Sequence, residues 1–134
     1  MGKITKLSVL IVLIIAFHIP VQSQETWTTY TEADGLIDNG INCIAIDDQD
    51  NVWLGTYSGV SKFDGTNWTT YTSNDGLVNN DVKAIGIDLQ DNLWFGTYFG
   101  ITKFDGSSWT TYTNSDGLVN NSIRSISVDA SGNL

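Results

Sequence analysis

A 41-residue period limits the folds open to this chain more than any other feature of the sequence. The motif Trp-Thr-Thr-Tyr-Thr begins at Trp27, Trp68 and Trp109, and Asp-Gly-Leu follows each time after two variable residues. Self-similarity at such a period is typical of solenoids and propellers. The copies occupy residues 27–67, 68–108 and, in part, 109–134.

Each copy contains four short segments rich in Trp, Tyr, Thr, Val and Ile, separated by Gly, Asn and Asp, which favours strands over helices. Ile44 and Ile46 alternate with the small residues Cys43 and Ala45, a pattern that suits the innermost strand of a blade. The sequence therefore predicts an all-β fold, an incomplete β-propeller of four-stranded antiparallel blades, over residues 24–134. The expected strands are 41–46, 52–56, 60–63 and 68–72, with further innermost strands at 82–87 and 123–128.

The N-terminal segment indicates export. Lys3 and Lys6 precede an apolar run from residue 7 to residue 17, and Pro20 follows. This run is too short for a bilayer span of about 20 residues, but it suits a signal peptide. We expect cleavage after Ser23, so that residues 1–23 are the signal peptide. The mature chain would then lack a stable membrane span and would be periplasmic, on the cell surface or extracellular.

Charge and histidine content argue against two large function classes. The formal net charge is −9 and the few cations are spread thinly among carboxylates, which disfavours nucleic acid as a partner. His18 is the only histidine and lies in the expected signal peptide. The mature chain therefore has no imidazole for acid–base catalysis or metal binding, and we expect neither enzyme activity nor a cofactor.

Comparison of the copies assigns structural roles to two small residues. Cys43 aligns with Ala84 and Ser125, so its position requires small volume and not sulfur, and we expect a small buried side chain. Gly55 lies inside an expected strand, where we interpret it as space for a neighbouring ring or a close backbone.

Two acidic patterns resemble functional sites but favour turns. Asp47, Asp48, Asp50 and Asn51 offer oxygen ligands for calcium, yet the EF-hand spacing is missing and the third copy loses most of the acids. We therefore expect a hairpin turn and no metal site. The aspartates of Asp-Gly-Leu recur in identical surroundings, whereas a catalytic pair needs different ones, so we expect them to cap turns. They are Asp34, Asp75 and Asp116.

An ordered string of residues resembles the two-component-regulator propeller repeat. In the second copy it runs Asp75-Gly76-Leu77, Asn80, Val82, Ile85, Asp88, Asn92-Leu93-Trp94, Gly96-Thr97 and Gly100-Ile101. One departure is that the family's usual glycine between the first two strands is Asp50 and Asp91 here, although Gly132 restores it. The resemblance implies a ring of such blades, the non-catalytic sensing part of an exported bacterial hybrid sensor kinase or a stand-alone surface protein.

The residues that vary between copies are the better candidates for binding, because blade geometry does not dictate them. In a propeller, the loops that join blades and those that join second to third strands open on one face, here called the rim. Amides and exposed aromatic rings there would suit a saccharide or peptide ligand. The candidates are Tyr57, Ser58, Tyr98, Phe99, Asn74, Asn79, Asn114 and Asn120.

Two functions remain open at this point. The first is a ligand-recognition propeller in the sensor region of a two-component signalling protein, for which the resemblance implies an oligosaccharide. The second is a secreted or surface scaffold or adhesion propeller that binds a protein. In either case two blades leave sheet faces uncovered, so we expect further blades of the same protein, or self-association, to cover them.

Overall fold

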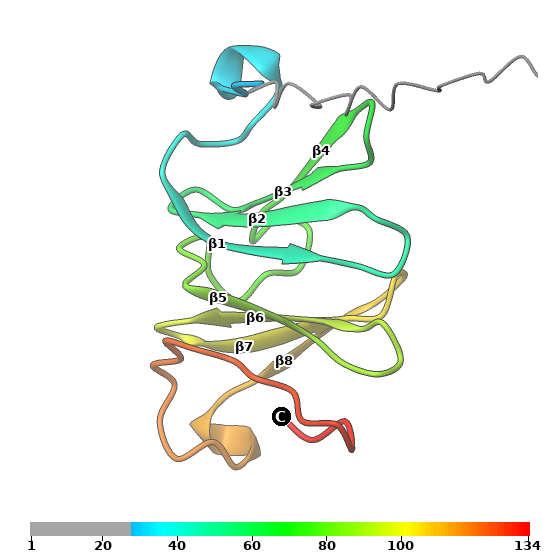
Figure 1. Ribbon diagram of the computed structural model, residues 1–134. Coiled ribbons are helices and arrows are strands. Elements are labelled where there is room, and N and C mark those ends of the chain that lie inside the picture. Colours follow the sequence, from blue (N-terminus) through cyan, green and yellow to red (C-terminus); the bar gives the residue numbers. More distant parts are fainter. Residues whose placement is uncertain (1–27) are drawn as a thin grey trace, which may run out of the picture.

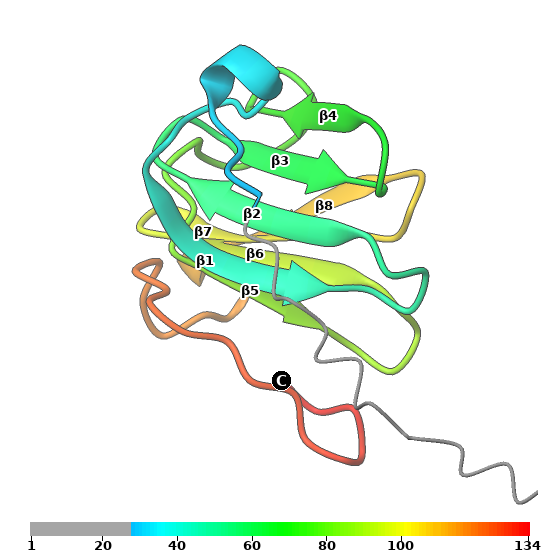
Figure 2. The ribbon, with the colours of Figure 1, turned by 45° about the horizontal axis from the view of Figure 1, so that its top comes forward.

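The computed structural model describes residues 28–134, which contain two four-stranded antiparallel sheets stacked one on the other (Figures 1 and 2). In both sheets the strands are hydrogen-bonded in chain order. The predicted all-β architecture of four-stranded blades is confirmed. The predicted signal peptide and Trp27 lie outside the described residues. The first sheet consists of β1 (Ile41–Ile46), β2 (Val52–Thr56), β3 (Val60–Phe63) and β4 (Trp68–Tyr71), and the second of β5 (Ala84–Ile87), β6 (Leu93–Thr97), β7 (Gly100–Phe104) and β8 (Trp109–Tyr112).

The strand prediction holds closely for the first sheet, where β1, β2 and β3 have the predicted bounds and β4 ends one residue early. It is wrong for residues 123–128, which form no strand. By the 41-residue period, the strand that would pair with this segment would start at Leu134. Only the first residue of that strand lies within the given sequence, so the segment has no strand to pair with. A strand is defined by such backbone pairing.

The two sheets meet over an aromatic core. Trp53 and Phe95 are buried with their ring centroids 6.1 Å apart, and Trp109 stacks on Phe104 at 4.3 Å and contacts Tyr71 at 5.5 Å. Large rings therefore fill the wedge between the blades. Aliphatic residues complete the core: Val60, Leu77, Val82 and Leu93.

Backbone hydrogen bonds join each copy to the next. The N–H of Val82 donates to the carbonyl of Thr56 at 2.9 Å, and the N–H of Ile123 donates to the carbonyl of Thr97 at 2.8 Å. Both bonds run from the segment just before or at the predicted innermost strand of one copy to the end of the second strand in the preceding copy. The stacking of blades is thus set partly by main-chain atoms, whose chemistry does not change with sequence.

The departure from the family pattern has a backbone explanation. Asp50 and Asp91 adopt φ angles of 63° and 60°, the left-handed conformation in which Gly132 also lies, at 83°. Aspartate tolerates this conformation better than most residues with a Cβ. All three copies therefore make the same turn.

Gly55 provides space, but not for a ring or a backbone as expected. A Cβ at this position would clash with the Cys43 sulfur and lie 2.8 Å from Val82 Cγ1. The close neighbours are small side chains, Cys43 of the paired strand β1 and Val82 of the next blade. The interpretation of Gly55 is corrected accordingly.

Both outer faces of the stack expose apolar surface. On β1, Ile44 and Ile46 are 63% and 60% exposed, whereas their counterparts one repeat later, Ile85 and Ile87, are half-buried against the core. On the other side, an apolar hollow of about 420 Å³ occupies the position that core residues fill one repeat earlier. It is lined by Trp94, Ile101, Tyr112, Asp116, Gly117, Leu118 and Leu134.

Cys43 is only partly buried, less than expected, and this partial burial leads to a prediction about its reactivity. Desolvation raises the pKa of the Cys43 thiol to about 11, although hydrogen bonding from Gly55 opposes the shift. Because the thiolate is the reactive form, we expect alkylation by iodoacetamide at pH 8 to be about a hundredfold slower than for an unperturbed thiol. The rate should rise with pH and recover in urea. Complete modification of the native chain within the time that the urea-unfolded chain requires would contradict this.

Candidate functional site

The rim lies where the β2–β3 and β6–β7 hairpins meet the segments that join the blades, on the left in Figure 1. Two contacts tie these loops together across large sequence distances. Ser58 Oγ donates to Asp38 Oδ2 at 2.6 Å, and Lys83 Nζ lies 4.5 Å from the ring centroid of Tyr57. The two kinds of loop therefore share one end of the blades.

The centre of the candidate site is a lysine between two tyrosines of neighbouring blades. Lys83 Nζ lies 5.3 Å from the Tyr98 ring centroid in addition to its contact with Tyr57. The same ammonium is 2.6 Å from Asp81 Oδ1, and this hydrogen bond raises the pKa of Lys83. Asn42 Nδ2 donates to Asp81 Oδ1 at 3.3 Å, so one carboxylate joins both copies. Cations over ring faces are attracted by the ring quadrupole.

The tyrosine rings remain accessible despite these contacts. Tyr57 is 58% exposed and Tyr98 is 45% exposed, while Phe99 beside it is more exposed still. Gly40 adjoins the Tyr57 ring so closely that a Cβ there would lie 2.6 Å from Tyr57 Cδ2. Its amide instead donates to Asp38 Oδ1 at 2.7 Å, and hydrogen bonds from Ser58 and Gly40 lower the pKa of Asp38.

The predicted amides are engaged in local turns. The oxygen of Asn79 accepts from the Asp81 N–H at 2.9 Å, and that of Asn120 accepts from the Ser122 N–H at 2.8 Å. Asn74 and Asn114 lie farther along the rim, in the turns after β4 and β8, where both are exposed. The structure thus gathers Tyr57, Ser58 and Tyr98 around one centre, and it does not place all the predicted amides there.

Sequence reasoning missed the charged residues at this centre. Position 83 is Lys, while the equivalent positions 42 and 124 are Asn and Arg, so it varies between copies as the loop candidates do. That variation could have identified Lys83. The expected innermost strand of residues 82–87 included Lys83, whereas β5 begins one residue after it, so Lys83 belongs to the loop residues of the rim.

The predicted turn-capping role of the Asp-Gly-Leu aspartates is confirmed. Asp75 Oδ2 accepts from the Thr72 N–H at 2.8 Å, and Asp116 Oδ2 accepts from the Thr113 N–H at 2.9 Å. Asp34 makes the same bond with Thr31. Their carboxylates are therefore engaged in stabilising the turn, as expected for a repeated structural element.

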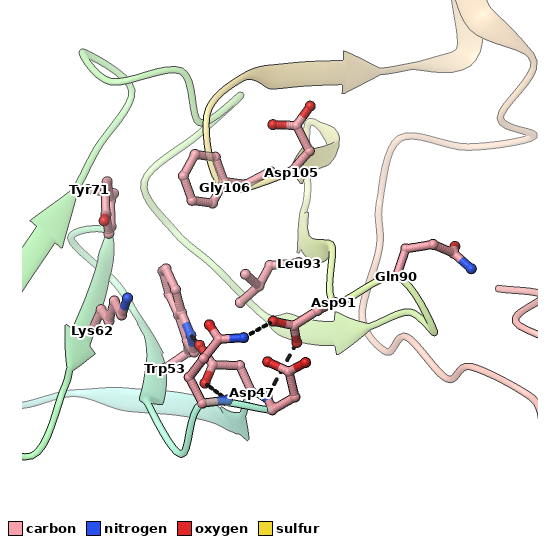
Figure 3. A pocket seen from close by; sticks show the side chains of 12 residues that line it. Asp47, Trp53, Lys62, Tyr71, Gln90, Asp91, Leu93, Asp105 and Gly106 are labelled. Atoms are coloured by element: carbon pink, nitrogen blue, oxygen red, sulfur yellow. Dashed lines mark hydrogen bonds between the residues drawn. The ribbon is translucent and has the colours of Figure 1, made fainter.

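The opposite end of the blades contains an acidic cleft of about 480 Å³ between the two sheets (Figure 3). Asp47 there accepts hydrogen bonds from Asn51 and, at 2.8 Å, from the indole N–H of Trp53. Burial opposes ionisation of its counterpart Asp88, but bonds from Trp94 and Asn92 outweigh this effect and lower the pKa of Asp88 to about 2. The calcium-like loop is thus a hydrogen-bonded turn, as predicted, and no group of three or more potential metal-ligating acids, cysteines or histidines gathers within residues 28–134.

Burial raises the pKa of Asp91, whose carboxylate crosses this cleft to the first blade. It accepts from Gln49 Nε2 at 2.9 Å, and Asp48 lies beside it. The contact links the turns of two neighbouring blades. It gives these residues a role in blade stacking.

Comparison with known proteins agrees with the fold. Residues 35–58 match the family described as two component regulator propeller. This segment is therefore similar to the two-component regulator propeller repeat. That match covers β1, β2 and the segment before them, and the 41-residue period extends it to the second copy.

A solved propeller of this type supports the fold beyond the matched segment. The extracellular domain of a hybrid two component system from B. thetaiotaomicron is 26% identical, with a TM-score of 0.69 over 77% of this chain. The chain spans 15% of the length of that protein chain. No curated protein sequence matches significantly. Within residues 28–134, none of the helical segments is long and apolar enough to cross a membrane.

Proposed function

We propose that the chain is part of the ligand-recognition region of an exported, non-catalytic sensor propeller of a two-component signalling protein. The similarity to a two-component extracellular domain supports export and a sensing role. We further propose a periplasmic or cell-surface location for the mature chain after removal of residues 1–23.

The observation that supports this function best is the exposure of aromatic rings on the rim. Trp53 and Phe95 lie in the core of the same repeats, so blade packing already has its large rings. Tyr57, Tyr98 and Phe99 instead face solvent beside charged and amide groups. Exposed rings next to a few fixed polar groups are characteristic of binding sites for sugars and peptides.

The proposed ligand is a saccharide, with a peptide as the other class that the same chemistry accommodates. A ring offers an apolar plane to a sugar face, while hydroxyl groups of the sugar can accept from the amide NH₂ groups of Asn79 and Asn120. The oxygens of these amides are already occupied by backbone N–H groups. Each NH₂ group can therefore donate to a ligand, and each oxygen keeps one lone pair with which to accept.

The test is retention of the purified chain on an array of neutral and acidic glycans. We expect Phe99→Ala and Tyr98→Ala each to lower the affinity for the retained glycan about tenfold, because each removes a stacking surface. Leu89→Ala is the matched control, since Leu89 is 62% exposed against 60% for Phe99 but lies at the opposite end of the blades. Unchanged affinity in both rim variants, or an absence of any retained glycan, would contradict the proposal.

A further inference from the structure

The ammonium group of Lys83 is compensated within the protein. Its Nζ lies 2.6 Å from Asp81 Oδ1, and its side chain is only 16% exposed. The two tyrosine rings flank the same group at 4.5 and 5.3 Å. A cation held by a carboxylate and two ring faces has few directions left from which to attract an external anion.

The charges surrounding this group favour uncharged ligands. Asp38 lies on the same rim and is hydrogen-bonded to Ser58, next to Tyr57. The pair of Lys83 and Asp81 is neutral overall, so Asp38 leaves the neighbourhood of Tyr57 with a negative balance. An approaching carboxylate or sulfate would therefore meet repulsion beside Tyr57.

The lysine also fixes where the rings lie. Tyr57 belongs to the first blade and Tyr98 to the second, and Lys83 is the group that both rings contact. Asn42 holds Asp81 from the first blade, through bonds of 3.3 Å to its carboxylate and 2.9 Å to the carbonyl of Val82. The two rings are thus placed by one network that spans the contact between blades.

From these observations we infer that Lys83 and Asp81 are specificity-determining positioning residues, which set Tyr57 and Tyr98 as a two-ring platform for a neutral saccharide and exclude acidic ones. This inference rests on the proposed rim function and adds the charge class of the ligand. Neither residue needs to contact the saccharide.

The experiment compares glycan classes on an array that carries neutral, carboxylated and sulfated oligosaccharides. The unaltered chain should retain neutral glycans. Asp81→Asn removes the partner of Lys83 but keeps the shape of the side chain, so affinity for carboxylated glycans should increase about tenfold and should fall again in high salt. Lys83→Arg should keep the neutral preference, because the cation is retained.

Two further variants separate positioning from stability. Gly40→Ala should displace the exposed Tyr57 ring and lower neutral-glycan affinity with little change in Tm. Lys103→Met is the matched control, because Lys103 contacts the ring of Trp94 at a similar distance of 5.3 Å within the second sheet. It should leave the glycan preference unchanged.

The outcomes distinguish this inference from the function on which it rests. If the chain retained acidic glycans and lost them in Tyr98→Ala, the rim would be a binding site and the inference would be wrong. If Asp81→Asn left the preference among glycan classes unchanged, the pair would not determine specificity. Retention of no glycan by any variant would overturn both proposals.

Discussion

Replacement of Asp47 by alanine is expected to lower the free energy of unfolding by about 3 kcal/mol, because it leaves buried donors without acceptors. The Asp47 carboxylate accepts from the Trp53 indole N–H at 2.8 Å and from Asn51 Nδ2 at 2.7 Å. Asp47, Asn51 and Trp53 are all buried. The corresponding fall in Tm is about 15 °C for a chain of this size, measured by tryptophan fluorescence during thermal unfolding.

The chain contains a matched control for this variant. Asp129 accepts the same turn bonds, from Asn133 Nδ2 at 2.9 Å and from Ser131 N at 2.8 Å, but it is exposed and water can replace it. Asp129→Ala should therefore lower the free energy of unfolding far less than Asp47→Ala does. Equal losses in the two variants would show that the turn itself, and not the buried link to Trp53, holds the blade.

Residues 24–134, expressed without the proposed signal peptide, are expected to self-associate at micromolar concentration. The exposed Ile44 and Ile46 form an apolar surface on β1, and the hollow beside Trp94 and Tyr112 leaves the other end of the stack uncovered. Contiguous apolar surface of this kind promotes association. The measurement is the sedimentation coefficient over a hundredfold range of concentration. We expect it to rise with concentration, because the average mass of the sedimenting species increases.

Charge on this face should reverse the association. Ile44→Lys combined with Ile46→Lys is expected to raise the dissociation constant about a hundredfold, because two buried isoleucines would contribute several kcal/mol between them. Leu89→Lys, at an equally exposed position in a turn, should have little effect. A wild-type chain that sediments as a monomer at every concentration and unfolds cooperatively would contradict the prediction.

The regular parts of the fold could be predicted because they repeat. The bounds of β1, β2 and β3 follow from local composition, and comparison of copies correctly assigned the Asp-Gly-Leu aspartates and the Asp47 turn. The errors arise where the structure depends on contacts between copies. Residues 123–128 have a strand-like sequence but no partner to pair with, and Val82, one of the two close neighbours of Gly55, comes from the next blade.

The centre of the rim was only partly predictable for the same reason. Tyr57, Ser58 and Tyr98 were found because loop residues that face solvent can be recognised from the repeat. The contact of Lys83 with Tyr57 depends on how two blades stack and on which rotamers meet between them. The 41-residue repeat gives no information about the distance between Lys83 and Tyr57.

Main-chain bonds join the blades, from Val82 to Thr56 and from Ile123 to Thr97. Side chains on the rim can therefore change during evolution independently of how the blades stack. Stacking that relies on carbonyl and amide groups does not depend on which side chains surround the junction. Residues on the rim can therefore be exchanged in successive copies while the blades keep their spacing. A repeat of this kind can diversify what it recognises without redesigning how it assembles, and the differences among Asn42, Lys83 and Arg124 are the kind of variation that this freedom allows.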